Sequence, residues 1–275
     1  MLAGERRDIV PIGNELRTLA WLGVMLIATG VGIVVKKHFD QIGPLSIAIV
    51  IGLAAISCYS FVVWRRGTLT DYIVLLGALL ISADVAFIET QWHLLGSEWQ
   101  RHFLLLAILH AVAAYWFTAK PVLTLSITAL AAWLGIERNS THSAMELATR
   151  FFICAAILVV WRLLNRKPDF AAIFDHFAAN IAFWGSMALA LNDDTRWLGV
   201  LIALIGAAAA VVYGFRRRRE PFVVYGNVYG FAALDIAISS LIKEPVFVTF
   251  FVLFSMAILI TIMLVTHLRF RRFAV

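Results

Sequence analysis

Side chains that can take part in acid–base chemistry occur inside long apolar stretches of this sequence. The segment ISADVAFIETQWH, residues 81–93, holds two carboxylates, Asp84 and Glu89, while Asp235 and His110 lie within two other apolar stretches. If these stretches cross a lipid bilayer, a charge at its centre costs about 2.5–3.5 kcal/mol, so such residues face a bundle interior and have a partner or a role. All four are therefore candidates for a polar site that handles protons or cations.

Helix geometry limits how these acids can act together. Asp84 and Glu89 are separated by five positions, which places them about 140° apart around an α-helix. One small ligand therefore cannot meet both from the same face, and Glu89 shares its face with Ser82 and His93 instead. The structural alternative is that Asp84, His110 and Asp235 are protonated or hydrogen-bonded groups that tie helices together.

Histidine and carboxylate pairs raise the question of a metal site. Such pairs can bind a divalent cation, and three of them have members four residues apart: Glu89 with His93, Glu98 with His102, and His142 with Glu146. No HExxH or cysteine-containing pattern fixes their geometry, so we predict no metal site. We also expect no cofactor and no catalytic residue, because no enzyme signature is present, and therefore no enzyme activity.

The composition excludes a soluble globular protein. Hydrophobic residues make up 62% of the 275 residues and charged residues 15%, whereas soluble domains carry about 45–50% and about 25%. The sequence therefore predicts an integral membrane protein whose main partner is the lipid bilayer. The net charge of +6 is explained by basic loops held on one side of the membrane, so we expect no binding of nucleic acid.

Apolar segments of about 20 residues mark the expected membrane spans. The sequence predicts ten of them, at 18–35, 44–64, 69–91, 102–119, 121–136, 147–164, 171–191, 196–214, 221–242 and 245–267. With ten spans, the side holding both termini carries most of the 23 Lys and Arg residues, which predicts that both termini are cytoplasmic. We expect an all-α, polytopic helical bundle forming one transmembrane domain over residues 1–275, with no soluble domain.

Glycines at helical spacing are candidate points of close helix packing. Gly226 and Gly230 form a GxxxG pattern in the ninth expected span, and the first span contains Gly23, Gly30 and Gly32. Small residues at such spacing let membrane helices approach each other closely.

Three segments of the chain also carry a family resemblance. These are GVMLIATGVGIVVKKHFDQIGPLSIAIVIGLAAI (23–56), ALLISADVAFIETQWHLLGSEWQRHFLLLAILHAVAAYW (78–116) and RRRREPFVVYGNVYGFAALDIAISSLIKEPVFVTFFVLFSMAILI (216–260). Together they resemble a family of bacterial predicted membrane proteins of unknown function. The resemblance implies a multi-pass protein of the bacterial inner (cytoplasmic) membrane and carries no activity or site residues.

Two roles from different classes fit these observations. The first is a small-solute or ion transporter, in which ten spans form two halves of five and Asp84 and Asp235 couple proton movement. The second is a non-catalytic accessory, assembly or scaffolding subunit, acting with a protein partner or as a homo-oligomer. The absence of a soluble domain and of enzyme motifs favours the second role, whereas the acids within the spans favour the first.

Overall fold

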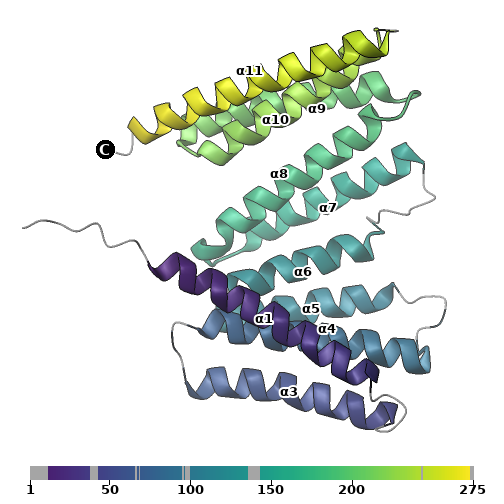
Figure 1. The fold of residues 1–275 in the computed structure, drawn as a ribbon, viewed down its shortest axis with the longest axis vertical. Helices are drawn as coiled ribbons and strands as arrows, with labels where there is room; N and C mark the ends of the chain where they lie inside the picture. The colour runs from purple at the N-terminus through teal and green to yellow at the C-terminus, as the bar shows by residue number, and fades with distance from the viewer. Residues whose placement is uncertain are drawn as a thin grey trace, which may run out of the picture. The chain divides into compact units, whose positions relative to one another are not determined.

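The computed structural model describes residues 12–37, 43–65, 67, 69–94, 96, 100–135, 143–242 and 244–272. These residues form ten helices and no strand, which confirms the all-α prediction (Figure 1). The chain divides into two compact units, residues 1–133 and 134–275. Each unit contains five of the helices, so the division falls where the sequence suggested two halves of five.

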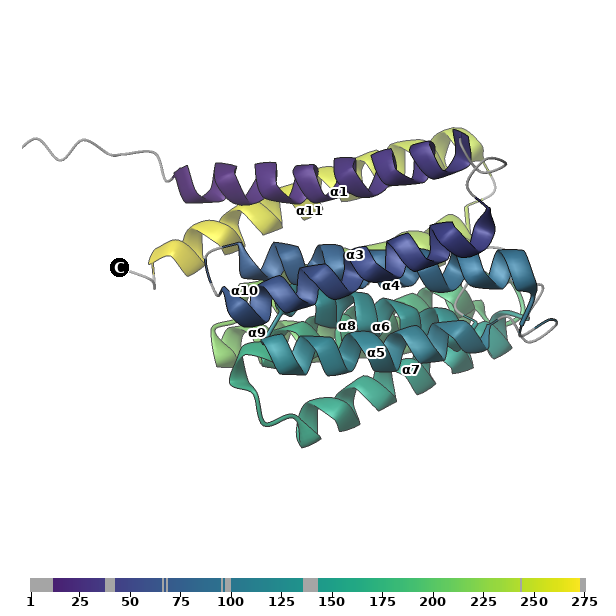
Figure 2. The same ribbon diagram turned by 90° about the horizontal axis from the view of Figure 1, so that it is seen from below.

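The first unit is built from a single helix followed by two pairs. Its helices are α1 (Ile12–Lys37), α3 (Pro44–Trp64), α4 (Thr70–Trp92), α5 (Arg101–Phe117) and α6 (Lys120–Trp133). The helices α3 and α4 pack as one pair and α5 and α6 as another, with α4 in contact with both α5 and α6. The helix α1 contacts α4 and lies on one face of the unit (Figure 2).

The second unit consists of two pairs followed by a single helix. Its helices are α7 (Ala144–Leu164), α8 (Pro168–Ala190), α9 (Arg196–Arg217), α10 (Glu220–Ser239) and α11 (Pro245–Arg272). The pairs are α7 with α8 and α9 with α10, while α8 also contacts both α9 and α10. The last helix, α11, lies along α10 at the edge of the unit (Figure 1).

Length and composition make most of these helices suitable for crossing a membrane. Six are long and apolar enough among the described residues, and they are α3, α4, α7, α9, α10 and residues 245–270 of α11. The apolar helices α5 and α6 are shorter, and α6, with 14 residues, matches the shortest of the ten expected spans. The structure thus supports several membrane-spanning helices, while the number of ten and the cytoplasmic termini stay predictions.

The glycine predictions have different outcomes in the two units. A methyl group added to Gly226 would lie 2.6 Å from the carbonyl oxygen of Ala207, and one added to Gly230 would lie 3.1 Å from the Ala207 side chain. This confirms that the GxxxG pattern lets α10 approach α9 closely. The same prediction for Gly23, Gly30 and Gly32 is wrong, because added methyl groups there would meet nothing within 4 Å.

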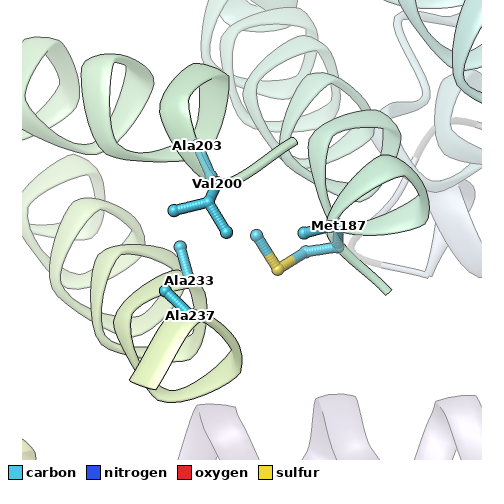
Figure 3. Packing of buried hydrophobic residues seen from close by; sticks show 6 residues of the cluster. Met187, Val200, Ala203, Ala233 and Ala237 are labelled. Atoms are coloured by element: carbon cyan, nitrogen blue, oxygen red, sulfur yellow. The ribbon is translucent and has the colours of Figure 1, made fainter. Parts of the chain in front are cut away.

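Small residues also form the core where three helices of the second unit meet. Met187 and Ala190 of α8 are buried against residues of α9 and α10 (Figure 3), namely Val200, Ala203, Ala233 and Ala237. The alanine side chain is small, so the helix backbones can approach each other closely at these positions. Such close packing is a main source of helix association when lipid surrounds the bundle. This packing fixes α8 and α10, the helices that carry the polar residues Asp175 and Asp235 of the second unit.

Candidate functional site

Asp84 lies well inside α4 and faces α3. A methyl group added to Gly52 of α3 would lie 3.2 Å from Oδ2 of Asp84, so the absence of a side chain at Gly52 makes room for the carboxyl group. The other oxygen, Oδ1, is buried and has no hydrogen-bond partner within the described part of the chain. A buried polar atom without a partner is unusual in folded proteins and calls for an explanation in terms of a bound proton, an ion or water.

His110, on α5, is almost completely buried and bonds to a different face of α4. Its Nε2 lies 2.8 Å from the hydroxyl oxygen of Ser82. Ser82 donates its own proton to the carbonyl oxygen of Ala78 at 3.1 Å, so Nε2 of a neutral His110 is the donor in this bond. Nδ1 is then an acceptor, and it is buried without a hydrogen-bond partner among the described residues.

The sequence suggested that Asp84 and His110 form one polar site. In the first unit, Asp84 instead faces α3, and His110 bonds to Ser82 on another side of α4. Ser82 and Asp84 are two positions apart and lie about 200° from each other around α4. Because Ser82 is bonded to His110 of α5, Asp84 is directed towards α3. The hydrophobicity of the surrounding sequence predicts that both residues lie within apolar helices. Only the packing of α4 against α3 and α5 shows that they belong to two separate sites.

Asp235, in the second unit, resembles Asp84 in its place within an apolar helix and in having one buried carboxylate oxygen. It lies within α10, a helix apolar enough to cross a membrane. Its Oδ1 is buried, and none of the residues that the structure describes forms a hydrogen bond with it. Each unit therefore contains one carboxylate of this kind within a span.

Glu89 lies near the end of α4 in a separate pocket of about 540 Å³. The pocket is also lined by His93 and His102. Nδ1 of His93 lies 2.9 Å from the backbone oxygen of Glu89 rather than from its carboxylate. Within the described part of the chain, no group of three His, Cys, Asp or Glu residues could hold a metal ion. Of the other expected pairs, Glu98 and His142 lie outside the described residues, and Glu146 pairs with Arg150 at 2.7 Å.

The second unit contains a charged cluster whose partners the sequence did not indicate. Asp175 of α8 has Oδ2 at 2.5 Å from Nη1 of Arg219, between α9 and α10, and Oδ1 at 3.3 Å from Nε of Arg162, in α7. Nε of Arg162 is buried and is not aligned for a hydrogen bond. The hydrogen bond from Arg219 to Asp175 raises the pKa of Arg219 above its ordinary value, so its guanidinium group stays charged.

A second polar contact links α8 to α10 further along the same helices. The hydroxyl of Tyr229 donates to Oδ1 of Asn180 at 3.0 Å, and the hydroxyl of Tyr225 lies 3.1 Å from Nδ1 of His176. The two α8 residues are four positions apart, as are the two tyrosines, so both bonds form on the facing sides of the helices. This four-residue spacing was the sequence signal that could have predicted the contact.

The comparisons with known proteins agree with a membrane protein. Residues 3–124 match the family described as "Predicted membrane protein (DUF2157)", which confirms the resemblance to a family of predicted membrane proteins of unknown function. The match covers less than half of the chain. No curated protein and no solved structure matches the sequence. Together with the six long apolar helices, the family match supports a membrane location.

Proposed function

We propose that this protein transports a small solute or an ion across the bacterial inner membrane, coupled to the movement of protons. The observation that carries the proposal is the pair of carboxylates, Asp84 and Asp235. Each lies within an apolar helix, and each has a buried oxygen without a hydrogen-bond partner among the described residues. An ionised carboxylate without a partner is unfavourable in a bilayer. Each acid therefore gains stability from binding a proton or a cation, which is the property a coupled transporter requires.

Two further features support this role. His110 supplies a buried nitrogen in the first unit that has no hydrogen-bond partner among the described residues, and this nitrogen can accept a hydrogen bond close to α4. The arrangement of five helices in each of two compact units is the organisation expected of transporters built from two halves. The proposed role involves no covalent catalysis.

Purified protein in phosphatidylcholine vesicles loaded with a pH-sensitive dye tests this role. A jump in external NaCl, KCl or a mixture of small polar metabolites should move protons in vesicles with protein and not in empty ones. Asp84→Asn and Asp235→Asn should each abolish this proton flux, because the amide cannot bind and release a proton. Asp193→Asn is the matched control, since Asp193 lies in an exposed turn and should leave the flux unchanged.

The alternative role is an accessory subunit that binds another membrane protein. Its support is α11, which packs mainly on α10 and exposes Phe247, Phe250 and Phe254. A protein partner would cover these rings as well as lipid would. Extraction in mild detergent distinguishes the roles. A partner present in stoichiometric amount, together with the absence of any proton flux, would favour the accessory role, whereas a monomer or homo-oligomer with flux would support transport.

A further inference from the structure

A groove in the second unit combines the Asp175 cluster with an apolar wall. The groove has a volume of about 590 Å³, within the range of about 300–1,000 Å³ that is usual for ligand sites. One end contains Arg162, Asp175 and Arg219. The remaining wall is apolar. It combines five alanines of α7 and α8 with larger side chains, namely Ala155, Ala156, Ala178, Ala179 and Ala182 with Val159, Leu163, Phe174, Tyr213 and Phe222.

The charged end of this groove retains a positive charge. Asp175 is paired with both Arg162 and Arg219, so two guanidinium groups share one carboxylate. The bond to Arg219 is short, whereas Nε of Arg162 is close to the carboxylate without forming a hydrogen bond. Arginine is well suited to bind a phosphate group through paired N–H donors, and the Arg162 and Arg219 side chains line the groove and are 35% and 39% exposed.

The apolar part of the groove continues along the helices. A neighbouring cavity of about 340 Å³ shares Ala179, Ala182, Tyr213 and Phe222 with it, and extends along α8 and α9 to Ser186 and Gly206. The charged residues lie near the ends of α7 and α9 and in the second turn of α8. The combined groove thus runs from a charged helix end towards the middle of the apolar helices.

We propose that this groove binds one anionic phospholipid, with its phosphate on Arg162 and Arg219 and an acyl chain along the alanine-lined wall. Basic pockets between membrane helices are suited to anionic head groups, and the remaining positive charge selects such a lipid over a neutral one. The apolar continuation selects a lipid over free phosphate. This inference goes beyond the proposed transport role and does not depend on it.

Native mass spectrometry of the full chain in detergent tests the proposal by titration with phosphatidylglycerol and with phosphatidylcholine of the same acyl chains. We expect a first phosphatidylglycerol to bind at least about fivefold more tightly than phosphatidylcholine, in line with one additional charge contact. Equal binding of the two lipids would overturn the proposal. Displacement of the bound lipid by excess sodium phosphate would overturn the assignment to a lipid.

Matched variants separate this groove from general attraction to the basic surface. Arg219→Gln and Arg162→Gln should each weaken phosphatidylglycerol binding by about fivefold or more. Arg216→Gln and Arg217→Gln remove the same charge from the same run of arginines, but neither residue lines the groove, so binding should change by less than about twofold. Equal losses in all four variants would indicate diffuse attraction only and would overturn the proposal.

A variant without any change of charge keeps the proposal testable if the arginine variants fail to fold. Ala179→Phe would fill the groove where its two cavities join, and should abolish one-to-one retention of phosphatidylglycerol. The control is Ala208→Phe, which adds the same ring at an exposed position of α9 outside both cavities. Unchanged binding to the Ala179→Phe variant would overturn the placement of the acyl chain.

Discussion

Asp84 in the first unit and Asp175 in the second are the same residue type within comparable helices, yet their surroundings differ completely. Asp175 has an arginine on each of its two oxygens, at 2.5 and 3.3 Å. Asp84 has one oxygen that is buried without a hydrogen-bond partner in the described structure, and its other oxygen lies opposite a glycine. Asp175 therefore has charged partners that link α7, α8 and the N-terminal end of α10, whereas Asp84 is the acid to which the proposed proton coupling is assigned.

Asp175→Asn should have the largest effect on stability. The change removes the negative charge that balances Arg162 and Arg219, which are partly buried. Breaking a fully buried pair costs about 3–5 kcal/mol, and the partial exposure of both arginines reduces the expected loss to about 1–3 kcal/mol. Thermal unfolding in detergent, followed by the fluorescence of the nine Trp residues, measures the loss.

The control for this prediction is Asp193→Asn. Asp193 also pairs with an arginine, Arg196, but its side chain is 87% exposed. Exposed ion pairs contribute little to stability, so the unfolding temperature should not change. Equal losses in the Asp175 and Asp193 variants would contradict a structural role for the buried cluster.

Ser82→Ala should have the next largest effect. It removes the hydrogen-bond partner of Nε2 of the buried His110, and an unsatisfied buried donor costs about 1–3 kcal/mol. Ser57→Ala is a suitable control, because the Ser57 hydroxyl is exposed and bonds only to a carbonyl of its own helix. If both variants unfold at the same temperature, the bond to His110 does not hold α4 and α5 together.

Tyr229→Phe should have a smaller effect. The variant loses the hydrogen bond to Asn180 and keeps the stacking of the ring on Phe183 at 4.4 Å. Hydrogen bonds between membrane helices contribute about 0.6 kcal/mol on average, so the loss should be close to that value by the same unfolding measurement. A loss exceeding that of Ser82→Ala would show that the second unit depends more strongly on its polar contacts than the first.

Asp84→Asn should have the smallest effect on stability while abolishing the proposed proton flux. Oδ1 of Asp84 has no hydrogen-bond partner among the described residues, so the change breaks no hydrogen bond there, and we expect a change in unfolding free energy within about 0.5 kcal/mol. A loss as large as that of Asp175→Asn would remove the contrast between the two acids. Asp84 would then be a structural residue, and the transport proposal would lose its main support in the first unit.

The sequence alone determined that this is an all-α membrane protein, because composition and segment length are properties of the chain and do not depend on packing. It also predicted that Asp84, His110, Glu89 and Asp235 lie within or at the ends of apolar helices, for the same reason. A close packing face on α10 was predictable from Gly226 and Gly230, since their spacing places both on one side of the helix, but the sequence did not show that α9 packs there.

Only the tertiary structure decided which polar groups meet. The pairing of His110 with Ser82, and of Asp175 with Arg162 and Arg219, depends on which faces of which helices pack together. Which helix faces pack together also decides that the glycines of α1 do not lie at a close helix contact. Periodicity gives the position of a residue around its own helix, but the rotation and the neighbours of that helix follow from packing against all the others.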